Sequence, residues 1–206
     1  MESLRLAHLY ANEVKENMKT IKLEELLKDR ALRKEVIRDI KDGKIFIYPT
    51  DTVYGLGCNA FQGPSVKSIR EIKNTGHPFS IIAPSKDWIK RNFHLPSPKY
   101  LDKLPGPYTL ILKKKRPTFL TSSSIYFSLG VRIPDHPLTK IIQEADVPFI
   151  TTSANVSGLP TIKEVNEKIS ARLRLGVDIA IDGGKIEGKP SQIIDLTGEK
   201  PEILRK

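Results

Sequence analysis

The sequence predicts an α/β fold in which helices flank a mixed β-sheet. Short apolar runs rich in β-branched residues alternate along the chain with segments whose apolar residues recur every three or four positions. This alternation is typical of strands and amphipathic helices packed in layers. At 206 residues, 39% of them hydrophobic, the chain is long enough for one sizeable core and too short for two large domains.

The first helical segment is predicted between Glu16 and Asp42. Its apolar residues fall mostly at helical spacings and Gly43 supplies a stop, so one or two amphipathic helices are expected. The residues before Glu16 form either a further short helix or a loosely attached extension.

The first predicted strand, 45–48, runs directly into a polar turn. The strand is a short run of apolar β-formers, and Pro49 ends it by removing a backbone donor. Thr50 and three further polar side chains follow, and Gly55 would let the backbone approach a ligand closely. The segment is therefore either a ligand site at the carboxyl end of a strand or an ordinary strand followed by a turn.

The remaining elements follow from the same patterns. Apolar residues at a spacing of three predict a short helix over 64–73, and helical spacing also predicts helices at 138–145 and 163–173. Short apolar runs predict strands at 79–83, 108–113, 131–133, 149–152, 179–182 and 192–196.

Polar side chains follow several of these strands. Thr151, Ser153 and Asn155 lie at the end of the strand at 149–152, where they could bind a nucleotide. Arg132 projects from a short strand between apolar neighbours, so it either grips a carboxylate or phosphate with two hydrogen bonds or belongs to an ordinary ion pair. Ser191 either contributes to the same site or only caps a turn.

The charge balance favours polyanionic partners. The chain has 34 Lys and Arg against 24 Asp and Glu, a net charge of +10, which suits RNA or nucleotide phosphates but also describes a lysine-rich solvated surface. The single cysteine, Cys58, cannot form an internal disulfide or hold zinc with other cysteines. With no run of eighteen apolar residues and no secretory signal, a cytoplasmic protein without a membrane partner is expected.

Common catalytic signatures are absent from the sequence. It contains no G-x-x-x-x-G-K-[ST] phosphate loop, no G-x-G-x-x-G fingerprint and no His/Cys cluster with metal-ligand spacing, so no protein-held metal is expected. Its four histidines are scattered, and nothing in their order indicates a Ser-His-Asp triad. Any nucleotide must therefore be bound by a different scheme.

Five ordered motifs resemble the YrdC/Sua5 family of threonylcarbamoyl-AMP synthases. They are PTDTVYGLG at 49–57, PGPYTLIL at 105–112, GVRIP at 130–134, TTSANVSG at 151–158 and SQIID at 191–195. The resemblance covers about residues 22–206, and it implies an N-terminal extension, 1–21, before a single YrdC-like catalytic domain of the short form. It also implies a twisted sheet with a large basic cavity.

The resemblance implies a reaction and its partners. Such enzymes condense L-threonine, bicarbonate and ATP into threonylcarbamoyl-AMP and pyrophosphate, with Mg²⁺ expected on the pyrophosphate, and a separate transferase complex then modifies tRNA. The alternative is a non-catalytic protein that binds tRNA or double-stranded RNA through the basic cavity.

By resemblance, the site residues have three roles: binding threonine, catalysis and binding ATP. Thr50, Arg132, Thr151 and Ser191 would hold L-threonine, with Arg132 pairing its carboxylate. Catalysis would rest on Lys73 and Arg132, which neutralise charge on the reacting phosphate. ATP would be held by Lys73, Ser128, Ser153, Asn155, Thr161 and Arg205.

The chain departs from the family pattern after Lys73. Thr75 stands where an arginine is usual, and the loop into Pro78 is about two residues shorter than the family's. The resemblance leaves Arg70, His77 or Lys86 as alternative sources of the missing positive charge.

Overall fold

The computed structural model describes residues 18–166 and 170–205. The strands of this part of the chain are β1 (Lys19–Lys22), β2 (Phe46–Tyr48), β3 (Gly55–Gly57), β4 (Ser80–Ile82), β5 (Phe93–His94), β6 (Tyr108–Lys114), β7 (Ser128–Arg132), β8 (Phe149–Ser153), β9 (Ile179–Asp182), β10 (Gln192–Asp195) and β11 (Glu202–Arg205). The helices are α2 (Leu23–Lys28), α3 (Arg30–Lys41), α4 (Gly63–Lys73), α5 (Lys86–Asn92), the 3₁₀ helix η1 (Pro98–Lys103), α6 (Pro137–Glu144) and α7 (Ala171–Gly176).

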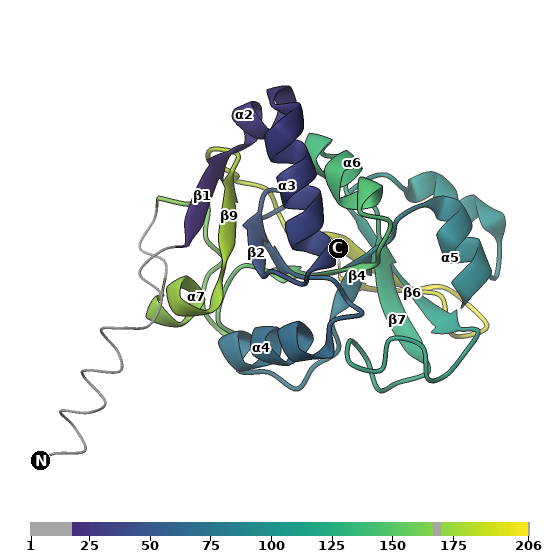
Figure 1. Ribbon diagram of the computed structural model, residues 1–206. Coiled ribbons are helices and arrows are strands. Elements are labelled where there is room, and N and C mark those ends of the chain that lie inside the picture. The colour runs from purple at the N-terminus through teal and green to yellow at the C-terminus, as the bar shows by residue number, and fades with distance from the viewer. Residues whose placement is uncertain (1–17, 167–169, 206) are drawn as a thin grey trace, which may run out of the picture.

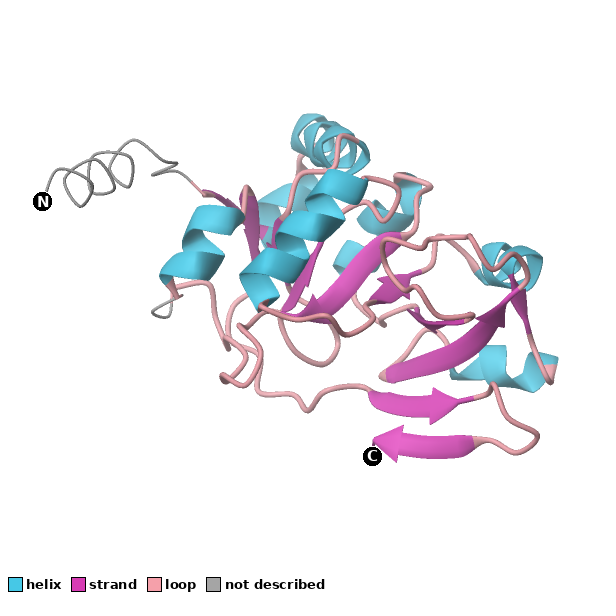
Figure 2. Ribbon diagram, turned by 90° about the horizontal axis from the view of Figure 1, so that it is seen from below, coloured by secondary structure: helices cyan, strands magenta, loops and turns pink. Residues whose placement is uncertain are grey.

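The described strands form one mixed sheet. Its order is β1-β9-β2-β3-β8-β4-β7-β6-β10-β11, and β5 pairs with β6. The pair β2–β9 is parallel, whereas β2–β3 and β3–β8 are antiparallel. Figure 2 shows β11 as the edge strand that carries the C-terminus. The predicted α/β fold with a mixed sheet and flanking helices is confirmed.

Two helical layers cover the two faces of the sheet's first half. In β2, Phe46 and Tyr48 pack in one apolar cluster with α2, α3 and α6, while Ile47 packs in another with α4 and α7. Alternation along a strand accounts for this division, since successive side chains point to opposite faces. Figure 1 shows α3 and α6 on one side of the strands, and α4 and α7 on the other.

Local capping explains where two of the helices begin. The Asp29 carboxylate accepts hydrogen bonds from the backbone amides of Ala31 and Leu32, at 2.7 and 3.0 Å, and so starts α3. In α5, Ser85 Oγ accepts from the amide of Trp88 at 3.0 Å. The first cap lies inside the predicted region 16–42, which therefore contains two helices separated at Asp29.

Some predicted elements differ from the observed ones. The segment 19–22 is a strand paired with β9, so the expectation of helix across it was wrong. A helix was predicted at 163–173, but the observed one is α7, and Lys163 and Glu164 are not helical. The elements β3, α5, β5, η1 and β11 were not predicted. Most of the predicted N-terminal extension, residues 1–17, lies outside the described residues.

The strand β3 depends on a close backbone approach. A Cβ atom added to Gly57 would lie 2.0 Å from the carbonyl oxygen of Ile150 on the neighbouring β8. The glycine therefore allows β3 to fit between β2 and β8, although glycine is a poor strand former.

We predict that Gly57→Ala destabilises the fold by at least about 2 kcal/mol, because the added methyl group forces two paired strands apart. The measurement is the thermal unfolding midpoint. Gly76→Ala is the matched control, since nothing lies within 4 Å of a Cβ at that position. Equal midpoints for the two variants would contradict the close-approach explanation.

Candidate active site

A cavity of about 200 Å³ lies on the same face of the sheet as α6. Side chains of β4, β6, β7 and β8 contribute to its lining. Seven of the ten residues predicted for the site line this cavity: Thr50, Arg132, Thr151, Ser153, Thr161, Ser191 and Arg205. Alternation along β8 explains why Thr151 lines the cavity. Thr151 points to the same face of the sheet as Phe149, which packs with α2, α3 and α6.

Arg132 is the buried cation of the cavity. Arg132 is only 6% exposed, and one of its guanidinium nitrogens donates to Asp51 Oδ1 at 2.6 Å. The terminal nitrogens also donate to Thr52 Oγ1 at 3.3 and 3.4 Å, while Nε is buried without a partner. Burial lowers the pKa of Arg132, and the Asp51 carboxylate opposes that shift. The Nε–H is therefore a buried donor of Arg132 that no described residue satisfies.

The Asp51 carboxylate fixes the position of the Arg132 guanidinium. Its second carboxylate oxygen accepts from the backbone amide of Asp135 at 2.9 Å, so the carboxylate links the turn after β2 to the segment after β7. The ion pair with Arg132 is itself buried, at 7% and 10% side-chain exposure. The guanidinium is consequently fixed in one orientation.

The hydroxyl of Thr50 is committed to its own turn. Thr50 Oγ1 accepts from the amides of Thr52 and Val53 and donates to the Val53 carbonyl oxygen at 2.7 Å. Thr50 lines the cavity, as predicted, but this hydroxyl shapes the turn. Thr52, which the sequence analysis did not select, presents its hydroxyl to Arg132 instead.

Tyr48 orients the hydroxyl of Thr151. The phenol lies fully buried under the cavity and donates to Thr151 Oγ1 at 2.7 Å. Burial raises the pKa of Tyr48, which keeps it protonated as a donor. Because Thr151 Oγ1 accepts this bond, its own hydrogen is available to an acceptor in the cavity.

Lys73 lies behind the cavity wall and reaches it through Ser153 and Asn155. Its ammonium donates to the Ser153 carbonyl oxygen at 2.8 Å, to Ser153 Oγ at 3.3 Å and to Asn155 Oδ1 at 2.7 Å. Burial lowers the pKa of Lys73 to about 8. Lys73 and Asn155 do not line the cavity themselves.

The opposite wall joins Ser191 to Arg205. Ser191 Oγ lies 2.8 Å from Thr109 Oγ1, and the Arg205 guanidinium donates to the Ser191 carbonyl oxygen at 2.8 Å. Partial burial and then the charge of Arg132 lower the pKa of Arg205. Two guanidiniums thus border a cavity whose lining includes no carboxylate, an arrangement that favours an anionic ligand.

A loop between β9 and β10 closes one side of the cavity. Tyr54 anchors the start of the loop, since its hydroxyl donates to the Gly184 carbonyl oxygen at 2.8 Å. Further along, a Cβ at Gly188 would lie 2.0 Å from the Thr52 carbonyl oxygen, so the loop presses directly on the turn. Figure 2 shows this long loop running into β10.

The last predicted residue, Ser128, lies outside the enclosed cavity. It is on the same face of β7 as Arg132, four residues away. The side chains of Ser80 and Thr109 pack over Gly130 between them, since a Cβ there would lie 2.4 Å from Ser80 Oγ and 3.2 Å from Thr109 Cγ2. Arg70, one alternative source of positive charge, donates instead to the carbonyl oxygens of His77, Ser122 and Ser123. Its guanidinium therefore secures a loop.

No metal-binding cluster is apparent among the described residues. Within them, no three His, Cys, Asp or Glu side chains gather in a way that could hold an ion. In the same part of the chain, none of the helices is both long and apolar enough to cross a bilayer.

Comparison with known proteins places the geometry in a family. The Sua5/YciO/YrdC profile, described as telomere recombination, matches residues 38–206. The chain belongs to the Sua5/YciO/YrdC family. A Methanocaldococcus jannaschii relative, provisionally named as a threonylcarbamoyl-AMP synthase, is 39% identical over 201 residues, which span 91% of this chain and 92% of the relative.

Other members of the family align with this chain, either over about half of their own length or over nearly all of it. The threonylcarbamoyl-AMP synthase of Pyrococcus abyssi is 32% identical over 175 residues, which cover 81% of this chain and 51% of the synthase. A crystal structure of P. abyssi Sua5 with L-threonine aligns with a TM-score of 0.72 at 28% identity, covering 92% of this chain and 57% of that one. YciO of Escherichia coli aligns with a TM-score of 0.78 at 24% identity, covering 92% and 96% of the two chains, which shows the common fold alone.

We predict that the Lys73 ammonium titrates near pH 8, because burial disfavours its charge. The pKa can be measured from the ¹³Cε chemical shift, with the resonance assigned from its loss in Lys73→Met. The folded pKa lies below the unfolded value of 10.5, so the cost of the buried charge is present below about pH 8. The free energy of unfolding, relative to Lys73→Met, should then rise between about pH 8 and 10.5. A midpoint near 10.5 would refute the buried-cation explanation.

Proposed function

We propose that this chain is an L-threonylcarbamoyladenylate synthase, which condenses L-threonine, bicarbonate and ATP into threonylcarbamoyl-AMP and pyrophosphate. The observation that carries the proposal is the hydroxyl-lined cavity with Arg132 and Arg205 at its border and no carboxylate in its lining. Relatives that match most of this chain are named for the same reaction. A single catalytic domain over residues 22–206 is part of the proposal.

The enclosed cavity suits the amino acid. At about 200 Å³ it is smaller than the roughly 300–1,000 Å³ of sites for drug-sized ligands. The threonine carboxylate would accept from the unpartnered Nε–H of Arg132, and Thr151 would donate its hydroxyl hydrogen to the same substrate. Ser191 would complete this half of the site. Thr50 would contribute the shape of the wall, since its hydroxyl bonds to Val53.

The nucleotide would extend from the cavity toward Ser128. Ser153, Thr161 and Arg205 line the cavity, and Ser128 lies farther along the same face of β7. Asn155 and Lys73 stand behind Ser153. Lys73 would either hold this wall in place or exchange one of its three acceptors for a phosphate oxygen.

The chemistry would consist of charge neutralisation and positioning. The threonine amine adds to the carbon derived from bicarbonate, with loss of water, and the new carboxylate attacks the α-phosphorus of ATP as the bond to pyrophosphate breaks. Arg132 and Lys73 would offset the negative charge at that centre. Mg²⁺ would enter with ATP, held by phosphates and water, because the described residues offer no cluster of ligands for it.

Downstream, a separate transferase complex would consume the product in tRNA modification, and a cytoplasmic location fits that role. The non-catalytic alternative, in which the cavity only docks tRNA or double-stranded RNA, is not favoured, because full-length relatives are named as enzymes. The charged residues of the lining are two arginines, so the enclosed space is better matched to one small anion than to a nucleic-acid backbone.

The test is pyrophosphate release from MgATP and bicarbonate, with and without L-threonine. We predict threonine-dependent release, and kcat/KM for threonine about 30-fold lower or worse in Arg132→Ala, because a buried charged contact is lost. Lys73→Ala should also lose most activity.

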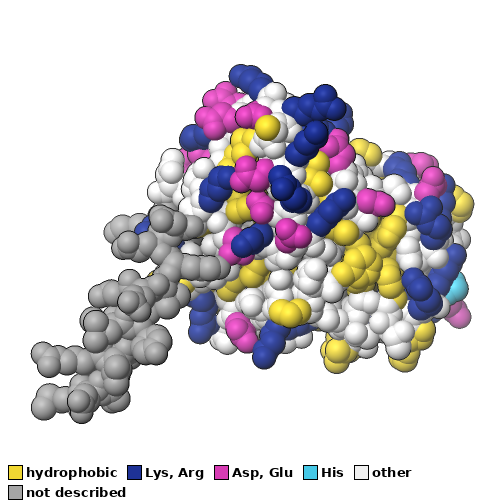
Figure 3. Space-filling view, in the orientation of Figure 1, with side chains coloured by type: hydrophobic (Ala, Val, Ile, Leu, Met, Phe, Trp, Pro, Cys, Tyr) yellow, Lys and Arg dark blue, Asp and Glu magenta, His cyan; other side chains and the backbone are white. Residues whose placement is uncertain are grey.

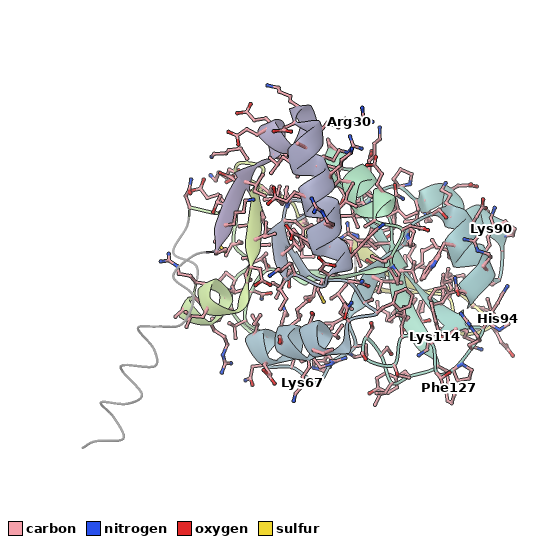
Figure 4. The ribbon with its side chains drawn as sticks, in the orientation of Figure 1. Arg30, Lys67, Lys90, His94, Lys114 and Phe127 are labelled. Carbon is pink, nitrogen blue, oxygen red and sulfur yellow. The ribbon has the colours of Figure 1, made fainter. Side chains whose placement is uncertain are left out.

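Arg30→Ala is the matched control, since Arg30 is an exposed arginine at the start of α3 (Figure 4) and does not line the cavity. Its rate should equal that of the unsubstituted protein. Threonine-independent release, or none under any condition, would count against the synthase.

A further inference from the structure

A groove runs between α4 and α7, on the face of the sheet opposite the cavity. It has a volume of about 750 Å³, and its apolar lining includes Ile45, Ile72 and Leu175. The two helices touch along it, since a Cβ at Gly176 would lie 2.4 Å from Ile72 Cδ1. None of the residues that line the groove also lines the cavity.

The wall that α4 contributes to the groove is formed largely by small side chains. Ser65 Oγ donates to the Gly43 carbonyl oxygen at 2.7 Å, and Ser68 Oγ donates to the Pro64 carbonyl oxygen at 3.2 Å. Because both hydroxyl hydrogens are already used, this wall has little need of a polar ligand. Leu175, on the α7 wall, is 45% exposed. Small residues facing an exposed leucine suit the apolar face of a helix.

The described part of the chain begins beside this groove. The backbone amide of Lys19 donates to the Asp178 carbonyl oxygen at 3.0 Å, where β1 starts to pair with β9, and Asp178 lines the groove. The side chain of Met18 packs against the apolar cluster that contains Ile45 and Ile72. Figure 1 shows β1 beside β9, and α7 and α4 together on one side of the strands. The residues before Met18 are therefore tethered next to the groove.

The segment that precedes Met18 has the sequence pattern of an amphipathic helix. Leu6, Tyr10 and Val14 recur at every fourth position, and the same spacing continues to Met18. Residues at this spacing share one face of a helix. An isolated helix of this length is marginal in water, so the apolar stripe needs a surface to pack on. The opposite face of such a helix is polar and consists of Arg5, His8, Asn12, Lys15 and Glu16.

The length of the stripe matches that of the groove. On α4 the lining extends from Pro64 to Ile72, eight positions or about 12 Å along a helix axis, and Leu6 and Val14 are separated by the same number of positions. Because the segment is tethered beside the groove, its effective concentration there lies in the millimolar range, above what a free protein partner reaches. The tether therefore favours the chain's own segment over a second copy.

We propose that residues 4–17 form an amphipathic helix that docks in the groove between α4 and α7. Leu6, Tyr10 and Val14 would cover Ile72 and Leu175, and the polar face would point to solvent. Since none of these groove residues lines the cavity, the proposal does not depend on the synthase activity.

The test is the rate at which a maleimide probe labels Leu175→Cys in the full chain. The chain's single cysteine, Cys58, is buried with 0% exposure, so labelling reports on the introduced thiol. Leu27→Cys on α2 is the matched control, because Leu27 is 41% exposed. Figure 3 shows Lys, Arg, Asp and Glu side chains mixed over α2 and α3, which is typical of a solvated surface. We predict that Leu175→Cys is labelled at least about tenfold more slowly than Leu27→Cys.

Breaking the apolar stripe should remove this protection. Tyr10→Asp/Val14→Asp should raise the labelling rate of Leu175→Cys about tenfold, because two unpaired carboxylates cannot be buried against the groove, and should leave Leu27→Cys unchanged. His8→Asp/Asn12→Asp introduces the same side chains on the polar face and should alter neither rate. Ser68→Cys, a nearly isosteric change on the α4 wall, is a second probe and should be protected in the same way.

Equal labelling rates at the groove cysteines and at Leu27→Cys would overturn the proposal. So would protection that persists in Tyr10→Asp/Val14→Asp, because the groove would then be shielded without this segment. Protection that increases with protein concentration would assign the groove to a second copy of the chain, and would overturn the proposal as well.

Discussion

The arrangement of the cavity depends on burying one positive charge, that of Arg132. A buried guanidinium is tolerated only when most of its donors are satisfied, and Asp51 and Thr52 supply that compensation from a turn 80 residues earlier in the chain. This requirement draws the turn after β2 against the end of β7. The Asp51 carboxylate extends the same link to the Asp135 amide, so β7 leads into α6 in a fixed direction.

The remaining walls follow from this anchor. The loop before β10 presses Gly188 on the Thr52 carbonyl, and it delivers Ser191 to the hydroxyl of Thr109. The hydroxyls and amides of this wall are bonded to one another, whereas Arg132 Nε has no partner and the hydroxyl hydrogen of Thr151 is not used by Tyr48. A preorganised site of this kind spends little free energy on ordering when an anion binds.

Much of the layered fold and of the cavity lining could be predicted from the sequence. Apolar periodicity indicates which elements pack against one another, and polar residues at strand ends indicate where a site can form. Other features depend on contacts between distant segments. β1 has one buried residue, Ile21, and forms only beside β9; β3 is Gly-Leu-Gly, and every residue of β11 is exposed. Likewise, the sequence indicates hydroxyls at Thr50 and Thr52 without showing which one its own turn consumes. The serine before α5 is a sequence signal for the start of that helix, and the motif residues Asp51 and Thr52 are sequence signals for the partners of Arg132.

The central claim is that Arg132 receives the carboxylate of an amino-acid substrate in a space already shaped for it. Calorimetric titration of L-threonine and of L-threoninamide, which lacks the negative charge, tests this directly. We predict that threonine binds at least about tenfold more tightly than the amide, and that Arg132→Ala removes most of this difference. Equal affinity for acid and amide in the unsubstituted protein would contradict the account.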